Sequence, residues 1–591
     1  MLEIYANGKR LHLPDDIEID MTFENPFFTQ GSVPATHSMT FTLPPTKENL
    51  QVIGNANRIA AAGVWSDLES RVLFNSSTIS VGRLKLQETE KLLKFYFVGS
   101  LVPDLVRKRM NLLNVDLYEF GEGLNTPDDF DSGWPLVYKN TIETNAKSIG
   151  DKFAVCPVRV TGADWKRDEV LWGFLNAHRL YLNPWNVNNG SYLFTQSGDP
   201  TVHSTVFPQP YIHYLIDLVF GASLNSNFIK DDAELKKLAM ITSFHKSFSE
   251  ADVFTYSRKG VIIDSYELWE QRYFYLSSYF NKYAFNDFLK NILKVFCGSL
   301  MPRPDGKWDI LLNKDIMQNT DIVDWTNKLV GTPLTTNQKA QRYIYGYSSE
   351  ALDLDNGGYA TVASIEAMMA SSTETTYKIA STGEIYEKRL KDPEVPGEYE
   401  YERLKTGLGG FDNSEIDDDE TYSMQSDVQA CKMRPDVYWH ENSGVTRNPW
   451  YVPEFSGNRF ALDFAPEIGF MRGFYNLSTK QIVSEPEAYS GHYPLLTPYN
   501  YDPNGNKVGD YSLAWEGADG LFSKFHQEFK EYIESDHLVL KGNFHLTHLD
   551  LKNLDFKKKS YIRGKLFYLK KIETKFRKRS ISLSKCELME A

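Results

Sequence analysis

The opening stretch restricts the fold most, because its apolar residues recur every second position. Residues 17–23 place Ile17, Ile19, Met21 and Phe23 between polar neighbours, a pattern typical of a strand with one buried face. Asn7-Gly8 lies between two short apolar runs and predicts a two-residue hairpin turn. We therefore expect residues 1–54 to form a β-platform, with a short helix beginning near Thr46.

Four stretches in one order along the chain resemble a known family. They are residues 24–28 with 31–32, 41–44 and Asn49; residues 286–292 with Phe296 and 309–314; residues 323–328; and residues 546–547 and 550–553 with Ile562, Tyr568 and 571–572. With Glu24-Asn25-Pro26-Phe27-Phe28 as its first part, this set resembles the tail hub proteins, also named baseplate or tail-tip proteins, of phages and prophages of Bacteroidetes-type bacteria. Residues 330–490 take no part in the resemblance.

The resemblance implies a structural protein of the virion tail, assembled in the cytoplasm of the host bacterium. It implies two tail-tube-like β-domains per chain, so that a homotrimer forms a ring that joins the tail tube to the tail tip and lets the genome pass. The implied partners are the tail tube and distal tail proteins, the tail-tip or spike protein and the tape-measure protein. The assembly contacts that we expect are Asn25, Pro26, Phe27, Phe28, Phe41, Lys557, Arg563 and Lys570.

The length of 591 residues exceeds what one hydrophobic core supports, so we expect several domains. The predicted fold class is multidomain α+β and β-rich, with small tail-tube-like β-barrel domains and inserted α/β and loop-rich domains. The predicted domains are an N-terminal tube-like β-barrel (1–118), a loop-rich aromatic domain (119–245), an α/β domain (246–335), an acidic loop-rich domain (336–510) and a C-terminal helix plus β-domain (511–591).

Apolar spacing also predicts individual elements. Residues 283–296 and 520–533 each carry one apolar helical face, and for the first helix we expect Asn286 as the N-cap and Gly298 as the end. Residues 231–240 are expected to form a short helix. Residues 439–453, which contain proline and asparagine, are expected to be loop-rich.

Charge is distributed unevenly. The formal net charge of −14 argues against a dedicated nucleic-acid binder, yet residues 350–427 carry a net −13 and residues 552–585 a net +11. Such regions can steer subunits together or can simply be two solvated faces. Because a basic lumen would retard DNA, we expect the cations of residues 557–579 at subunit contacts and outside the channel.

Cysteine use and hydropathy indicate the compartment. Four widely spaced cysteines, without metal-like spacing, are expected to be reduced and mostly buried. The N-terminus lacks the pattern of a signal peptide, and the longest apolar stretch, residues 211–222, is too short to cross a bilayer. We therefore expect a soluble protein without membrane insertion.

No pattern for catalysis, a cofactor or a metal is complete. Residues 353–364 begin like a calcium loop, but Ser364 stands where the loop needs a glutamate. His545, His548 and Asp550 are close in sequence, but residues three apart on a strand point to opposite faces, which favours a structural role. We therefore expect no catalytic residue and no enzyme activity.

Two other function classes stay open. A tail-associated cell-wall hydrolase needs opposed carboxylates, and these have no fixed spacing in sequence. A surface glycan-binding protein would present Trp134, Trp165, Trp185 or Trp439 as a platform, although aromatic residues in loops more often fix the loop to a core.

Overall fold

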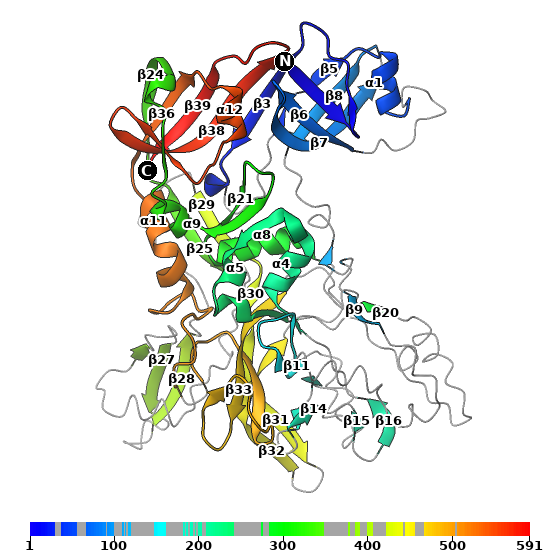
Figure 1. Cartoon of the computed structure of the whole chain (residues 1–591). Coiled ribbons are helices and arrows are strands. Elements are labelled where there is room, and N and C mark those ends of the chain that lie inside the picture. The colour runs from blue at the N-terminus through cyan, green and yellow to red at the C-terminus, as the bar shows by residue number, and fades with distance from the viewer. Residues whose placement is uncertain are drawn as a thin grey trace, which may run out of the picture.

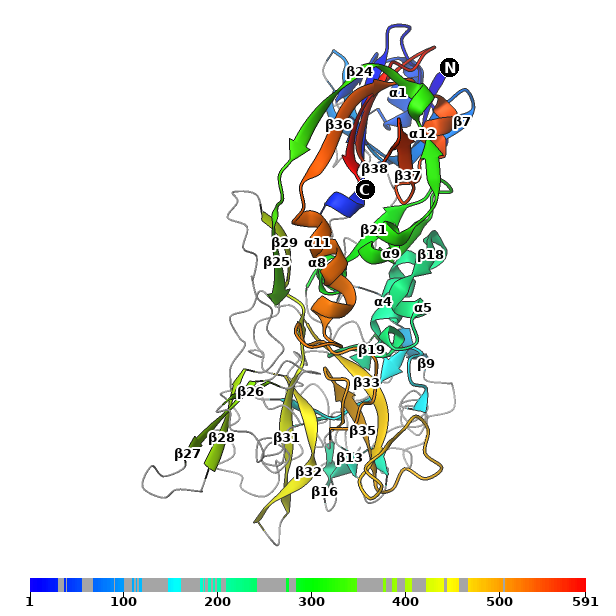
Figure 2. The ribbon, with the colours of Figure 1, turned by 90° about the vertical axis from the view of Figure 1, so that its left-hand side faces the viewer.

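The computed structural model describes the chain in separate stretches. They are residues 1–29, 40–55, 67–89, 91–99, 147–160, 209–241, 283–347, 421–440, 444–455, 466–502 and 505–591, with short pieces between them. Figure 1 shows both termini in one end of the molecule, here named the head. The remaining sheets and helices lie below it, and the view in Figure 2 shows the same arrangement from the side.

Both ends of the chain contribute to one 14-stranded sheet, named the head sheet. Its strands are β1 (Leu2–Ala6), β2 (Lys9–Arg10), β3 (Glu18–Glu24), β4 (His37–Ser38), β5 (Phe41–Leu43), β6 (Leu68–Phe74), β7 (Ser77–Thr89), β8 (Leu93–Gly99), β23 (Ile322–Asp324), β24 (Leu329–Gln338), β36 (His537–Phe544), β37 (Lys559–Ile562), β38 (Lys565–Arg577) and β39 (Ser584–Glu590). The main order is β2-β1-β6-β7-β8-β4-β3-β38-β39-β36-β24, with β5 beside β8, and β37 between β38 and β23.

The two halves of the head sheet meet where β3 pairs antiparallel with β38. Glu18 stands opposite Arg577, and Glu24 stands opposite Lys571. The first and last parts of the chain therefore share one ladder and one core. The domain boundaries given above remain a prediction.

The N-terminal platform follows its sequence pattern. The hairpin at Asn7-Gly8 is confirmed: β1 pairs with β2, and both turn residues have positive φ, 47° and 75°, as a type I′ turn requires. Along β3, Ile19, Met21 and Phe23 are buried and the residues between them are not. The predicted helix is α1 (Lys47–Val52), capped by Thr46.

A small α/β layer lies below the head. It contains α4 (Ile212–Phe220), α5 (Phe228–Asp231), α8 (Phe285–Val295), α9 (Asn313–Gln318) and the sheet β18-β22-β21, with β18 (Leu224–Asn227), β21 (Gly298–Pro302) and β22 (Trp308–Leu312). Beside it lie the parallel pair β25 (Arg342–Tyr347) and β29 (Thr421–Ser426). The predicted C-terminal helix is a π-helical turn, Phe522–His526, followed by α11 (Gln527–Ile533).

The lowest part is formed by further sheets. One is built around β33 (Glu467–Asn476) with β19 (Leu238–Ile241), β30 (Gln429–Ala430), β34 (Ile482–Val483) and β35 (His492–Thr497). A second has the order β12-β11-β32-β31, with β11 (Val158–Val160), β12 (Tyr181–Leu182), β31 (Lys432–His440) and β32 (Gly444–Phe455). A third joins β26 (Thr376–Lys378), β27 (Ile385–Leu390) and β28 (Tyr399–Lys405). The described part of the chain is thus β-rich with few helices, as predicted, whereas tube-like barrels remain a prediction.

Three predictions of individual elements were wrong. Ala284, and not Asn286, is the N-cap of α8, and the helix ends at Val295 with Phe296 as its C-cap, before Cys297 adopts a left-handed φ of 50°. Residues 238–241 form β19, since this continuous apolar run pairs with the buried β33. Residues 439–440 and 444–453 belong to the antiparallel strands β31 and β32, whose register shifts between Pro435 and Val437.

Two further expectations concern cysteines and membranes. All four cysteines are free and buried, as predicted. Among the described residues, no helix combines the length and the apolar character needed to cross a membrane.

Candidate functional site

Asn25, the first candidate contact residue, is fixed by the C-terminal half of the head sheet. Its side-chain amide donates to the carbonyl of Leu569 at 2.8 Å, and its side-chain oxygen accepts from the N–H of Phe27 at 3.0 Å. The second bond caps the 3-10 turn η1 (Pro26–Phe28). Asparagine carries both a donor and an acceptor, so one side chain satisfies the turn and the neighbouring strand at once.

Phe27 lies at the centre of an aromatic contact between the head and the elements below it. Its ring is fully buried, with ring centroids 5.1 Å from Phe529 of α11 and 5.1 Å from Tyr568 of β38. The hydroxyl of Tyr422, on β29, donates to the carbonyl of Phe27 at 3.3 Å. We name Phe27, Phe28, Tyr422, Phe529 and Tyr568 the aromatic contact.

The aromatic contact continues into a buried polar pair. His526 Nδ1 lies 2.7 Å from the hydroxyl of Tyr343, and His526 Nε2 lies 2.9 Å from the carbonyl oxygen of Val295. The ring of Tyr343 stacks on that of Tyr422 at 6.0 Å. Because His526 is fully buried, desolvation lowers its pKa to about 4. The imidazole is therefore neutral at physiological pH.

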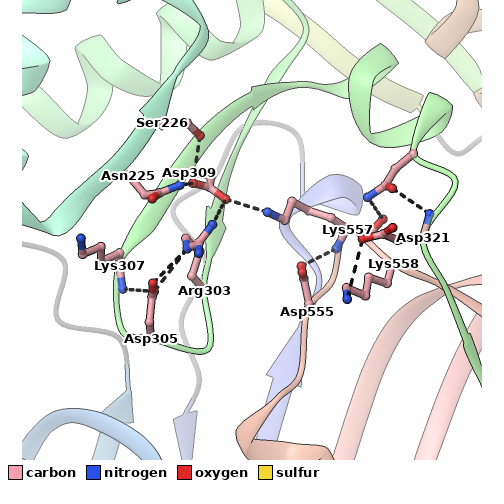
Figure 3. Close-up of polar contacts among 11 residues, drawn as sticks. Asn225, Ser226, Arg303, Asp305, Lys307, Asp309, Asp321, Asp555, Lys557 and Lys558 are labelled. Carbon is pink, nitrogen blue, oxygen red and sulfur yellow. Dashed lines mark hydrogen bonds and ion pairs between the residues drawn. The ribbon is translucent and has the colours of Figure 1, made fainter.

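A second contact between the head and the α/β layer is polar, and Figure 3 shows its side chains. Asp309 of β22 has a buried carboxylate that accepts from Asn225 at 2.8 Å and from Ser226 at 2.9 Å, both on β18. The same carboxylate lies 2.7 Å from Lys557 Nζ of the head and 3.4 Å from Arg303 Nη1. We name these five residues the polar junction.

The polar junction keeps Asp309 ionised. Burial alone would raise its pKa, but the hydrogen bonds from Lys557, Asn225 and Ser226, together with the charge of Lys557, outweigh burial and lower it. The backbone around Lys557 is also fixed, because its N–H donates to Asp555 at 3.1 Å and its carbonyl accepts from Asn319 at 3.2 Å. The junction thus joins three distant parts of the sequence around one carboxylate.

Lys557 thus lies in the polar junction, and the other predicted basic contacts also have neighbours within the chain. Lys570 pairs with Glu587 at 3.0 Å, and the exposed Arg563 donates its N–H to the hydroxyl of Thr326 at 3.2 Å. Elsewhere in the basic segment, Lys575 and Arg577 lie 3.0 and 2.7 Å from Glu18. Much of the positive charge of residues 557–579 is therefore balanced inside the chain.

The remaining candidate contacts lie in or against the core of the head. Pro26 and Phe27 are buried, Phe28 is half-buried against the core, and Phe41 is buried opposite Phe95. Within one chain these side chains stabilise the head itself. As contacts between chains, all eight predicted residues remain a prediction.

The sequence contains two candidate metal-binding segments, residues 545–550 and the calcium-like residues 353–364. Asp550 caps the helix α12 (His548–Lys552) together with Thr547 and pairs with Lys328, so the expectation of a strand at His548 was wrong. Among the described residues, no group of three His, Cys, Asp or Glu side chains could hold a metal ion. The calcium-like segment 353–364 lies outside the described residues.

The predicted tryptophan platform is described only in part. The ring N–H of Trp185 donates to the carbonyl of His492 at 2.7 Å, and its ring lies 6.1 Å from that of Phe474. This tryptophan fixes its segment to β33 and β35. Trp134 and Trp165 lie outside the described residues, and Trp439 lies on β31.

Sequence reasoning gave no role to Asp309, Tyr343 or His526. A signal existed for Asp309, which stands between Trp308 and Ile310 in an otherwise apolar strand. A single carboxylate in such a strand is buried with its neighbours and needs a partner. No comparable signal identifies Lys557 as that partner, because 248 positions separate the two residues.

Solved structures of tail proteins are among the structural neighbours of this chain. No protein-family model and no curated protein matches the chain. The 43 kDa tail protein of prophage MuSo2 from Shewanella oneidensis is 8% identical over 99% of this chain and 97% of that chain, with a TM-score of 0.28. The tail protein from Neisseria meningitidis MC58 is 7% identical over 100% of this chain and 96% of that chain, with a TM-score of 0.23. Both neighbours are tail proteins.

Proposed function

We propose that this chain is a structural subunit of a phage tail. In this role it acts as a hub that joins the tail tube to the tail tip, in a ring through which the genome passes. Three copies form the ring, and the neighbouring proteins are the tail tube, distal tail, tip or spike, and tape-measure proteins. The chain is assembled in the host cytoplasm, and the proposal assigns it no catalytic step.

One observation supports this proposal: the sequence stretches that resemble tail hub proteins contact one another in the folded chain. Asn25 and Phe27 of the first stretch contact Leu569 and Tyr568 near the last. Lys328 of the third stretch pairs with Asp550 of the fourth. Stretches separated by hundreds of residues thus hold one head together, which supports reading them as a single signature.

The head also has properties that suit a ring subunit. Its two halves join edge to edge into one sheet of 14 strands, and the contacts around Phe27 and Asp309 fix that sheet to the elements below. A closely packed sheet that is held in this way can transmit a fixed geometry to its neighbours. This favours a structural hub over a glycan-binding protein.

Light scattering on the purified full chain tests the proposal. Over a concentration series, at low and at physiological salt, we expect a species of three times the 67.8 kDa chain mass. Ring-shaped particles in electron micrographs of the same sample would agree with it. A constant monomer mass at every concentration and salt would contradict the ring.

A further inference from the structure

A cavity lies beside β34, in the lowest part of the molecule. Its volume is about 530 Å³, which is in the range of sites that bind small molecules. Two segments that are far apart in the sequence form it: residues 147–149, which precede β10 (Phe153–Ala154), and residues 484–485, which directly follow β34. The lining residues are Lys147, Ser148, Ile149, Ser484 and Glu485.

An aromatic row holds Lys147 in place at this cavity. The ammonium of Lys147 lies 5.1 Å from the centroid of the Tyr489 ring, a cation–π contact. The ring of Tyr489 meets Phe474 of β33 edge to face at 4.8 Å, and Phe474 lies 6.1 Å from Trp185. The ring of Trp185 thus supports this row from inside the chain. A cation that is already held in one position loses less freedom when a ligand binds.

The cavity contains one positive and one negative side chain that do not pair with each other. Within the described residues, neither Lys147 nor Glu485 forms an ion pair, and the hydroxyl of Ser484 has no hydrogen-bond partner. Glu485 lies near the same aromatic ring, because burial and then the charge of Glu485 raise the pKa of Tyr489. The cavity therefore offers an ammonium, a carboxylate and a hydroxyl, with the half-buried Ile149 as apolar surface.

This combination of groups favours a ligand that carries several hydroxyls. A hydroxyl both donates and accepts hydrogen bonds, so one ligand can accept from the ammonium of Lys147 and donate to the carboxylate of Glu485. A simple anion would attract Lys147 but be repelled by Glu485, and a simple cation would meet the reverse. A sugar ring combines such hydroxyls with C–H faces that can pack on an apolar side chain such as Ile149.

We propose that this cavity binds a saccharide unit of a polysaccharide. Lys147 donates to oxygens of the sugar, Glu485 accepts from its hydroxyls, and Ile149 packs against a C–H face. The binding is a second role beside the structural one. Figure 1 shows β33, the strand that pairs with β34, well below the head. A ligand at this cavity therefore does not compete with contacts that the head makes, and the site lies within one chain.

Binding of the fluorescently labelled full chain to an array of bacterial polysaccharides tests the proposal. We expect retention on at least one polysaccharide, and displacement by the free monosaccharides of which that polysaccharide consists. Retention on none of them would overturn the proposal. Excess glycine, which carries both charges but no hydroxyl, should not displace the chain. Displacement by glycine and not by the monosaccharides would identify a site for zwitterions and overturn the assignment to sugars.

Four substitutions test whether the binding takes place at this cavity. Lys147→Met and Glu485→Gln should each raise the Kd for the retained polysaccharide by about 10-fold, because each weakens or removes a hydrogen bond to a charged group. Lys152→Met and Glu487→Gln, exposed residues of the same two segments outside the described lining, are the matched controls and should leave the Kd unchanged. Wild-type Kd values for both cavity variants would overturn the site. Weaker binding in Lys147→Met alone would indicate an anion site and overturn the assignment to sugars.

Glycan binding and chain association can fail independently. Trimers that are retained on no polysaccharide would overturn this site and leave the hub function standing. A monomer that is retained on a polysaccharide, and loses that retention in Lys147→Met and Glu485→Gln, would contradict the ring and support this site. Since all four substituted side chains are exposed, the urea midpoint of each variant should equal that of the wild type, which checks that the fold is intact.

Discussion

Two of the contacts that join the head to the elements below it have opposite chemistry. In the aromatic contact, Phe27 packs between Phe529 and Tyr568 without any charge. In the polar junction, the buried carboxylate of Asp309 faces Lys557. The first gains its free energy from apolar surface removed from water, whereas the second mainly offsets the cost of desolvating charges.

This difference predicts different responses to substitution and to solution conditions. Apolar packing loses free energy in proportion to the volume removed and responds little to salt. A buried ion pair adds little net stability when intact, but it is costly to break from one side, because the remaining charge stays behind. The two contacts can therefore be separated by experiment.

The largest effect is expected from Phe27→Ala. Removal of a fully buried ring leaves a cavity between α11 and β38 and should lower the free energy of unfolding by about 4 kcal/mol. Urea denaturation followed by tryptophan fluorescence measures the change. Phe28→Ala, at the half-buried edge of the same contact, is the matched control and should cost clearly less. If both variants lost the same free energy of unfolding, the buried ring of Phe27 would contribute no more to the aromatic contact than the half-buried ring of Phe28.

The next effect is expected from Asp309→Asn. This variant leaves Lys557 and Arg303 facing a neutral amide and should lower the free energy of unfolding by about 3 kcal/mol. Asp305→Asn, in the exposed turn of the same hairpin, serves as control and should change little. If both variants were equally mild, the polar junction would not hold the head to the α/β layer.

Local patterns of the head could be predicted from the sequence, because short-range chemistry dictates them. Asn7-Gly8 fixes its turn, and the apolar alternation of β3 fixes which face is buried. Residues 285–295 form a helix because their apolar spacing matches one helical face. The predicted N-cap, Asn286, lies two positions after the observed N-cap, Ala284.

Long-range partners could not be predicted. Nothing near Asn25 indicates that its amide donates to Leu569, 544 positions away, and nothing near Glu18 indicates Lys575 and Arg577 as neighbours. These contacts depend on the β3–β38 register, which is set by the packing of the whole head sheet. The surplus charge of the C-terminal segment suggested intermolecular steering, whereas many of its cations meet acids of the same chain.

A pH dependence should separate the two contacts further. The pKa of His526 is about 4 in the folded chain and near 6.5 in an unfolded one. Between these values the unfolded chain binds more protons, so the free energy of unfolding falls as the pH falls, by about 2 kcal/mol at pH 5. Asp309, whose pKa is lowered, keeps its charge in that range and loses its contribution only below about pH 4.

The variant His526→Gln tests whether His526 causes this dependence of the free energy of unfolding on pH. Glutamine can still bond to Tyr343 or Val295 but does not titrate, so the decline between pH 6.5 and 5 should flatten. Urea midpoints measured across that range give the comparison, and Asp309→Asn should keep the wild-type slope. A slope that persists in His526→Gln would place the titrating group elsewhere.

The smallest effect is expected where a charge pair lies on the surface of the head sheet. Glu18 lies 3.0 Å from Lys575 and 2.7 Å from Arg577, and these two cations lower its pKa. Glu18 and Arg577 are exposed and Lys575 is half-buried, so water and salt screen the interaction. Glu18→Gln should therefore shift the urea midpoint slightly at low salt and not at all in about 1 M NaCl. The shift of Asp309→Asn should persist in the same high salt, because the carboxylate at the polar junction is buried and ions cannot surround it. If salt removed both shifts equally, the polar junction would behave as a surface pair.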